Sequence, residues 1–149
     1  MPESSLRPPS LLALPSYLAG SVARIGHRHL EEVLEQRGLR LPQYAVLTAL
    51  SDFGPLAPHE IATRLQGDRS HVSAYIESLV QRGMVSRVQD AADRRRYTIA
   101  LTAAGAAHVN ELAVAATASQ RDFLSGLSTA ERHTLLALLT KVILTNEAR

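Results

Sequence analysis

The chain has 149 residues, of which 46% are apolar and 20% charged, so it is long enough for one folded domain and too apolar to be a disordered chain. It contains no cysteine, which excludes structural disulfides and thiol-based redox sensing. No apolar run approaches the ~18 residues needed to cross a bilayer, and no secretory pattern begins the chain, so a cytoplasmic protein with no membrane partner is expected.

Positive charge is concentrated in one part of the chain. The formal net charge at pH 7 is only +2, but residues 64–96 hold seven arginines and four acidic side chains, a balance of +3, whereas the rest of the chain has a balance of −1. Basic side chains gathered in this way are what contact with DNA phosphates requires. The segment 64–96 is therefore the first candidate for contact with nucleic acid.

The first forty residues predict an arm and one long helix. Residues 1–10 are rich in proline and serine and predict a mobile arm. Residues 11–38 predict a long helix that ends at Gly38, with Pro15 suited to its first regular turn. The apolar side of this helix consists of Leu14, Leu18, Val22, Ile25 and Val33, and its polar side of Glu31, Glu32 and Glu35.

Two shorter helices are predicted next, over residues 41–54 and 55–67. Pro42 and Pro58 fit their first turns, because the N–H group that proline lacks would be unpaired there. The side chains expected to point into the core are Leu47, Leu50 and Phe53 in the first helix and Ile61 and Leu65 in the second. A tight turn at Gly67 leads to the following helix, which predicts a helix-turn-helix.

The segment 68–105 carries the most informative pattern. Asp68 can cap a helix by accepting hydrogen bonds from the unpaired N–H groups of its first turn, and Gly83 can supply the left-handed residue that ends it. Two strands are predicted over residues 84–88 and 96–101, joined by a charged loop. A short helix followed by a hairpin with an arginine-rich tip is a shape suited to binding duplex DNA.

Two further helices are predicted in the C-terminal third. Thr102 can cap an alanine-rich helix that reaches about Leu124, and Ser128 with Glu131 forms a capping box for the last helix. The apolar residues that recur along this last helix are Leu135, Leu138, Leu139 and Val142. Because these apolar faces exceed what a small DNA-binding lobe needs, they predict a partner, and a symmetric homodimer is the commonest solution.

These features together resemble the MarR family of transcriptional regulators. The resemblance is carried by Gly83-Met84-Val85-x-Arg87 after the helix, Asp93-x-Arg95 in the loop, and Leu101-Thr102-x-x-Gly105 at the start of the next helix. It implies a mainly α fold with a small β-hairpin wing, that is, a winged helix-turn-helix with long terminal dimerisation helices. The implied organisation is a mobile arm over 1–10, a dimerisation helix over 11–40, a DNA-binding lobe over 41–101 and dimerisation helices over 102–149.

Candidate DNA contacts lie on the predicted recognition helix, residues 69–82, and in the wing, residues 89–96. Serine, histidine and alanine on the outer face of the helix can hydrogen-bond base edges or touch a thymine methyl group. The resemblance implies that Arg95 enters the minor groove, and Asp93 is expected to brace the loop through an arginine. The predicted set is Arg64, Arg69, Ser70, His71, Ser73, Ala74, Arg87, Arg94, Arg95 and Arg96.

Three charged side chains near this set allow more than one role. Arg64 and Arg87 are candidate phosphate contacts, but ordinary surface positions are equally compatible with the sequence. Glu77 lies on the outer side of the recognition helix, where it would repel phosphate. It therefore either accepts a hydrogen bond from a cytosine amino group or stays away from the DNA.

A pocket for an effector is a further implication of the resemblance, because regulators of this family bind small molecules between the dimer helices and the DNA-binding lobe. The residues expected in this zone are Tyr17, Arg24, His27, Tyr44 and His108. An aromatic face beside an arginine would suit a small aromatic or phenolic effector. The same residues could equally be part of the core and its rim.

Catalysis and bound cofactors are not expected. The sequence contains no glycine-rich phosphate loop and no spacing typical of a nucleophile with its base, so we predict that the protein is not an enzyme and binds no cofactor. No pair among its six histidines has the i, i+4 spacing of a zinc site, so no metal site is predicted.

The sequence therefore predicts a homodimeric, ligand-responsive repressor that binds a palindromic operator in double-stranded DNA. Residues 69–82 would lie in the major groove and residues 89–96 in the minor groove. Two alternatives stay open: a winged-helix module that binds protein partners or coats DNA nonspecifically, and a metal sensor.

Overall fold

The structure is a computed structural model that describes residues 6–149. Within this range the elements are α1 (Pro9–Leu12), α2 (Pro15–Glu35), α3 (Leu41–Phe53), α4 (Pro58–Leu65), α5 (Arg69–Gln81), β1 (Val85–Gln89), β2 (Tyr97–Leu101), α6 (Ala103–Phe123) and α7 (Thr129–Glu147). The two strands form one antiparallel hairpin. The predicted fold class, mainly helical with a small β-hairpin, is therefore confirmed.

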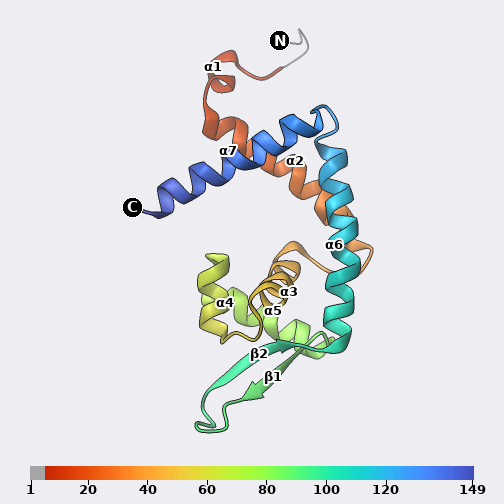
Figure 1. Cartoon of the computed structure of the whole chain (residues 1–149), viewed down its shortest axis with the longest axis vertical. Helices are drawn as coiled ribbons and strands as arrows, with labels where there is room; N and C mark the ends of the chain where they lie inside the picture. The colour runs from red at the N-terminus through yellow and green to blue at the C-terminus, as the bar shows by residue number, and fades with distance from the viewer. Residues whose placement is uncertain (1–5) are drawn as a thin grey trace.

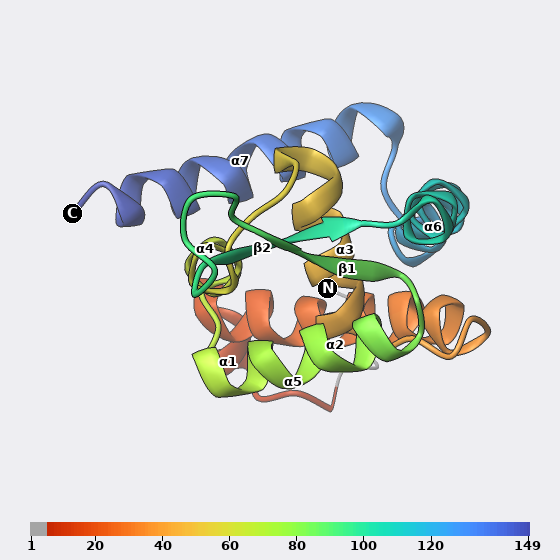
Figure 2. The ribbon, with the colours of Figure 1, turned by 90° about the horizontal axis from the view of Figure 1, so that it is seen from below.

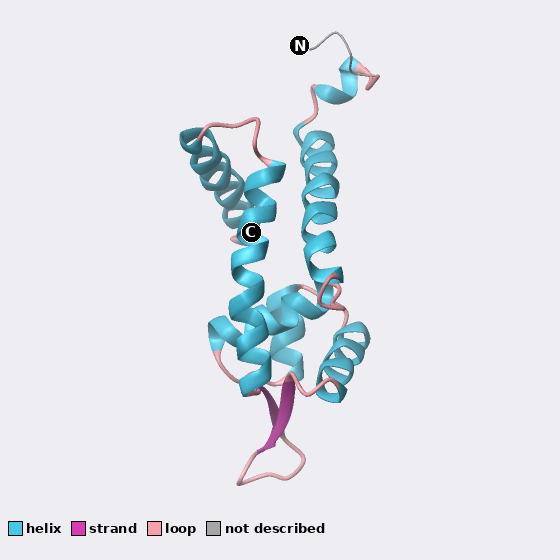
Figure 3. Cartoon of the chain, turned by 90° about the vertical axis from the view of Figure 1, so that its right-hand side faces the viewer, coloured by secondary structure: helices cyan, strands magenta, loops and turns pink. Residues whose placement is uncertain are grey.

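The elements are arranged in two lobes (Figure 1). Helices α3, α4 and α5 and the hairpin form the lower lobe, and α2, α7 and the upper part of α6 lie above it. Helix α6 runs from the base of the hairpin into the upper lobe and packs beside α2, as Figure 3 shows from the side. Seen from below in Figure 2, α5 and the hairpin lie next to each other on the lower lobe.

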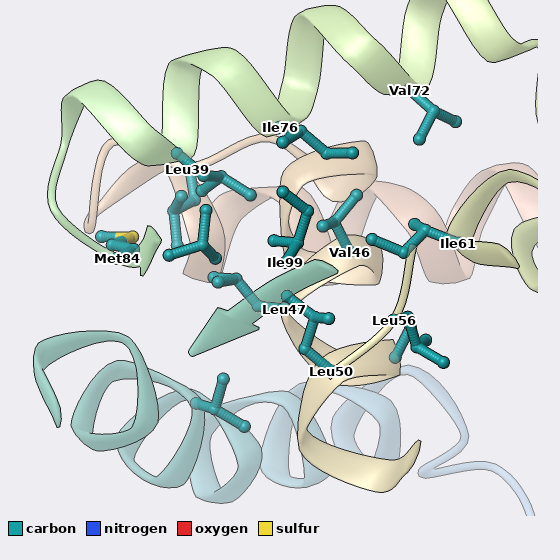
Figure 4. Close-up of a cluster of buried hydrophobic side chains, with 14 of the residues drawn as sticks. Leu39, Val46, Leu47, Leu50, Leu56, Ile61, Val72, Ile76, Met84 and Ile99 are labelled. Atoms are coloured by element: carbon teal, nitrogen blue, oxygen red, sulfur yellow. The ribbon is translucent and has the colours of Figure 1, made fainter. Parts of the chain in front are cut away.

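The core of the lower lobe is built from aliphatic side chains (Figure 4). The lower lobe and the adjoining parts of α2 and α6 contribute fully buried residues, which include Leu34, Leu47, Ile61, Leu79, Ile99 and Leu112. Burying a side chain of this size stabilises the fold by roughly 1.5–3 kcal/mol relative to leaving it exposed. Because these residues come from α2, α3, α4, α5, β2 and α6, their packing joins all six elements into one unit.

The hairpin is also attached to the helices through its backbone. Leu56, in the loop between α3 and α4, forms an isolated antiparallel bridge with Ile99 of β2. The N–H of Leu56 donates to the carbonyl of Ile99 at 3.1 Å, and the N–H of Ile99 donates to the carbonyl of Leu56 at 2.7 Å. Since the Ile99 side chain is completely buried, the middle of β2 is held by both backbone and side chain.

The helix-end signals predicted from the sequence are confirmed. The Asp68 carboxylate caps α5, the Thr102 hydroxyl caps α6, and Ser128 with Glu131 forms the capping box of α7. Gly83 has a φ of +71°, the left-handed conformation that ends a helix and that glycine adopts without strain. These signals are local, which is why the sequence alone identifies them.

The turn between α4 and α5 has a left-handed residue that is not glycine. Gln66, directly after Leu65, has a φ of +52°. The tight turn was expected at Gly67, but this residue serves close packing instead, because a Cβ atom on it would lie 3.1 Å from Cγ2 of Val72. The helix-turn-helix therefore turns one residue earlier than predicted.

The prediction that Phe53 points into the core is wrong. Its side chain is 54% exposed, and the guanidinium carbon of Arg64 lies 3.7 Å from the centroid of its ring. Phe53 is the last residue of α3, one turn beyond the buried Leu50, so its ring lies past the end of the aliphatic core. A cation over the ring face partly covers it.

The N-terminal boundaries differ from those expected. Residues 1–5 of the predicted arm lie outside the described residues, residues 6–8 have no regular structure, and Pro9 begins the short helix α1. The helix expected over 11–38 is interrupted before Pro15, whose missing N–H suits the first turn of a new helix, α2.

Helix α7 leaves a large apolar surface uncovered. It buries none of its side chains within the subunit, and five of them are more than half exposed: Leu136, Leu138, Val142, Ile143 and Leu144. Exposed apolar patches of this kind mark interaction surfaces in globular proteins. Across residues 6–149, no helix combines the length and the apolar character needed to cross a membrane.

We predict that Gly105→Ala destabilises the protein, although alanine is normally better than glycine inside a helix by about 1 kcal/mol. A Cβ atom at this position would lie 1.9 Å from the carbonyl oxygen of Met84. Relieving such an overlap typically costs about 1–3 kcal/mol, measured as the change in unfolding free energy in urea.

Gly126→Ala is the matched control, because a Cβ atom there would meet nothing within 4 Å. This control should leave the stability unchanged or raise it slightly. Equal stabilities for the two variants would mean that α6 does not start against Met84 as described.

Candidate nucleic-acid interface

Helix α5 presents a polar face opposite its buried side. Val72, Ile76 and Leu79 are buried, and this fixes the orientation of the helix on the lobe. The exposed side chains near its N-terminus are Arg69, Ser70, His71, Ser73 and Ala74, all of which were predicted site residues. The structure therefore brings these five predicted residues together on one accessible surface.

The start of α5 is fixed by Asp68. Its Oδ1 accepts hydrogen bonds from the backbone N–H of Ser70 at 2.9 Å and of His71 at 3.4 Å, and also from the Ser70 hydroxyl. The Ser70 hydroxyl and the backbone N–H groups of His71 and Ser70 lower the pKa of Asp68. The carboxylate is consequently charged at neutral pH and complements the positive end of the helix dipole.

The wing tip is shaped by two aspartates. The Asp90 carboxylate accepts a hydrogen bond from the N–H of Ala92 at 2.8 Å, and the Asp93 carboxylate accepts one from the N–H of Arg95 at 3.0 Å. Asp93 also lies 3.4 Å from Nε of Arg95 and 3.9 Å from Nε of Arg96. The expected bracing of the loop by Asp93 through an arginine is therefore present.

The arginines of the wing extend into solvent. The side chains of Arg95 and Arg96 are 93% and 81% exposed, and Arg94 is exposed as well. Their contacts with Asp93 are too exposed to hold the guanidinium groups tightly, because surface ion pairs contribute little. The tip thus offers three cations that are free to meet an anionic partner.

His59 lies between α5 and the wing and was not among the predicted site residues. It lines a hollow of about 230 Å³ together with Arg69 and Ser73, and a second hollow of about 690 Å³ together with Arg95 and Arg96. The sequence offered only its position directly after Pro58, at the start of the helix before α5. Its nearness to both surfaces depends on how α4 crosses α5, which the sequence does not specify.

Arg64 and Arg87, predicted as phosphate contacts, have other partners within the subunit. Arg64 is stacked on Phe53 and lines a hollow between α2, α3 and α4, and it lines neither of the two hollows beside His59. Arg87 forms an ion pair with Glu77 of α5. Both guanidinium groups are therefore already engaged by partners within the subunit.

The C-terminal end of α5 is tied to the neighbouring elements. Arg82 donates hydrogen bonds to the carbonyls of Gly38 at 2.6 Å and Arg37 at 3.0 Å, in the turn between α2 and α3. Gln43 of α3 donates to the Ser78 hydroxyl at 2.9 Å. These contacts hold α5 at the end away from its exposed polar cluster.

Among the hollows described for residues 6–149, none is lined by all five residues expected around an effector. Tyr44 lines the hollow of about 340 Å³ that also contains Arg64 and Asp52, whereas none of the other four predicted residues lines it. Burial, and secondarily the nearby charge of Asp52, raises the pKa of the Tyr44 phenol. The phenol therefore stays protonated and can donate a hydrogen bond near neutral pH.

The other four residues are spread over α2 and α6. The Tyr17 hydroxyl accepts from Arg7 at 2.8 Å, and Arg24 donates to the Ser21 hydroxyl at 3.2 Å. His27 is exposed, and the buried Nδ1 of His108 has no hydrogen-bond partner among the described residues. Within residues 6–149, no group of three or more histidine, aspartate or glutamate side chains is placed to bind a metal ion.

Comparison with known proteins finds similarity to bacterial transcriptional regulators. The model of the MarR family matches residues 39–97. The transcriptional regulator PecS of Dickeya dadantii is 29% identical over 140 residues, which span 90% of this chain and 84% of PecS. The transcriptional repressor NicR of Pseudomonas putida is 30% identical over 105 residues, spanning 70% of this chain and 66% of NicR.

A third relative is matched over a smaller part of its length. A protein described as a regulator of the hcr operon in Thauera aromatica is 29% identical over 99 residues, which span 66% of this chain and 60% of the relative. The match thus falls short of two thirds of that protein.

Solved structures of similar fold also cover most of the chain. BpsR of Bordetella bronchiseptica, whose DNA binding is described as regulated by 6-hydroxynicotinic acid, has a TM-score of 0.78 and 27% identity and covers 87% of this chain and 93% of its own. A mutant MarR of Escherichia coli solved with operator DNA has a TM-score of 0.76 and 26% identity, and the match covers 85% of this chain and 91% of the MarR chain. PcaV of Streptomyces coelicolor, solved with its natural ligand, has a TM-score of 0.76 and 27% identity, and the match covers 89% of this chain and 94% of the PcaV chain.

Proposed function

The chain belongs to the MarR family of winged helix-turn-helix transcriptional regulators, and from this premise we propose that it is a homodimeric, ligand-responsive repressor of a palindromic operator. The observation that carries the proposal is the common exposure of the polar face of α5 and the three arginines of the wing tip. A rigid helix next to a cationic hairpin matches the shape and the charge of adjacent DNA grooves.

In the proposed complex, α5 enters the major groove. Its 13 residues make a rod of about 20 Å, and its N-terminal polar cluster can reach base edges. Ser70, His71, Ser73 and Ala74 would face the bases, and Arg69 the phosphates. In the wing, Arg95 would enter the minor groove, with Arg94 and Arg96 on the flanking phosphates.

The proposed dimer forms through the terminal helices. The support is the uncovered apolar surface of α7, together with the partly exposed Leu14, Leu18 and Val22 of the N-terminal region. A two-fold dimer would cover these side chains and present two copies of α5. Copies about 34–36 Å apart would read two half-sites separated by one turn of DNA.

The proposed effector is a small aromatic or phenolic acid that binds near Tyr44. The hollow there combines an apolar wall with a protonated phenol and the guanidinium of Arg64, groups that suit an aromatic ring carrying a carboxylate. The likeness to BpsR, which responds to an aromatic acid, supports the same class. Such a ligand would release the operator only by preferring a dimer whose α5 helices are wrongly spaced.

We predict that Arg95→Ala weakens operator binding roughly ten-fold, because a minor-groove arginine and its phosphate attraction are lost, while the unfolding temperature stays unchanged. The affinity is measured by fluorescence anisotropy on a palindrome from the promoter of the protein's own gene and on a scrambled duplex. Arg28→Ala, which removes the same charge from an exposed position on α2, is the control.

Full operator affinity of Arg95→Ala would contradict the assignment of the wing. A wild-type protein that binds the palindrome and the scrambled duplex equally across a salt series would instead indicate nonspecific coating of DNA.

We predict that the double variant Leu138→Gln and Val142→Gln converts the protein from dimer to monomer. These side chains are 55% and 60% exposed in the subunit, so the folded subunit should survive, but the proposed interface loses apolar area. Light scattering gives the mass, and circular dichroism checks the helix content. Val88→Gln, which changes an exposed apolar residue of β1, should leave the mass unchanged. A wild-type monomer would refute the dimer.

We predict that at least one small aromatic carboxylate weakens operator binding and that Tyr44→Phe reduces its effect. The phenylalanine keeps the ring and removes the hydroxyl group that would bond the ligand. Anisotropy titrations of the protein–operator complex with a panel of benzoates and pyridine carboxylates measure this effect. If no member of the panel changes the operator affinity or binds the free protein, the proposed effector class is wrong.

A further inference from the structure

Glu77 places a negative charge on the surface that is proposed to meet DNA. It follows Ser73 by four residues and Ala74 by three, so the three side chains share one exposed face of α5. A lone carboxylate on this face would repel the DNA phosphates. Its presence on an otherwise neutral or basic face therefore needs a structural explanation.

The structure pairs this carboxylate with an arginine of β1, the strand that leads into the wing. Nη2 of Arg87, on β1, donates a hydrogen bond to Oε2 of Glu77, and the two side chains are 44% and 49% exposed. The guanidinium carbon of Arg87 lies 5.8 Å from the centroid of the Tyr97 ring on β2. The hydrogen bond to Glu77, followed by the charge of Glu77, raises the pKa of Arg87 above its ordinary value.

The position of Arg87 in the hairpin explains why it reaches α5. Arg87 is directly opposite Ile99 in the antiparallel register, and directly opposite residues share one face of a hairpin. Ile99 is completely buried against the helices, so Arg87 extends from the same, inward face. Its ion pair thus joins the exposed side of α5 to the strand that leads into the wing.

We propose that Arg87 is a positioning residue for DNA binding that acts through Glu77: its ion pair with Glu77 cancels a repulsive charge on the exposed face of α5. The inference rests on the proposed function, in which the two elements enter adjacent grooves together. An ion pair this exposed adds little to the stability of the fold. Its loss therefore changes DNA binding much more than unfolding.

This role predicts a pattern that a direct phosphate contact would not give. Arg87→Ala leaves Glu77 unpaired on the recognition surface and should weaken operator binding roughly ten-fold. Glu77→Gln removes the repulsive charge and should leave the affinity unchanged or raise it. In the double variant the charge is absent again, so the operator affinity should return to within about three-fold of wild type.

The test measures operator affinity for wild type and these three variants over a salt series, with unfolding temperatures as a check on the fold. The slope of log affinity against log salt in the double variant should equal that of wild type. A phosphate contact by Arg87 would instead lower the magnitude of the slope by about 0.9 in both Arg87 variants, without rescue by Glu77→Gln, and would overturn the proposal. A loss of operator preference in Glu77→Gln alone would also overturn it, because Glu77 would then be reading a base.

The ion pair between Arg37 and Glu111 is the matched control. It is similarly exposed, at 43% and 56%, but joins the turn after α2 to α6. Arg37→Ala should leave operator affinity within about two-fold of wild type. An equal loss in Arg37→Ala and Arg87→Ala would refute a role specific to the pair between Arg87 and Glu77. Absence of any operator preference in the wild-type protein would defeat the proposed function itself, and that result is distinct from all of these.

Discussion

The pairing of Leu56 with Ile99 is the constraint on which the lower lobe depends. A two-stranded hairpin is marginally stable on its own in water. Here the second strand has a backbone partner on its other side and a fully buried side chain in its middle. The base of the wing is therefore held on both sides of β2, whereas the tip between Gln89 and Tyr97 lies outside this pairing.

The structure divides the arginines into two groups that the net charge does not distinguish. Arg82 satisfies backbone carbonyls, Arg64 covers an aromatic ring, and Arg87 neutralises a carboxylate, so these three are committed to partners within the subunit. Arg95 and Arg96 have only weak, solvent-exposed contacts. The surface potential near the wing tip is consequently set by a few outward side chains, and the total of +2 says little about it.

The sequence predicted what local chemistry determines. The cap at Asp68, the left-handed Gly83 and the capping box at Ser128 each depend on a few neighbouring residues, so they could be read directly. The spacing of apolar residues likewise identified part of the core, including Leu47, Leu50 and Ile61. Contacts between distant segments could not be read in this way, which explains the error at Phe53 and the omission of His59 from the site. The partner of Arg87 was missed for the same reason, because it depends on how the hairpin crosses α5.

The tight start of α6 has a mechanical consequence. Because Gly105 lies directly against the Met84 carbonyl, the first turn of α6 has no room to shift relative to the base of the hairpin. The helix has 21 residues and is about 31 Å long, and its N-terminal turn packs against the base of the hairpin. A tilt of about 5° over that length displaces one end by about 3 Å relative to the other. Because the base of the hairpin also packs in the shared core, such a tilt would move the upper end of α6 relative to the lower lobe as a whole.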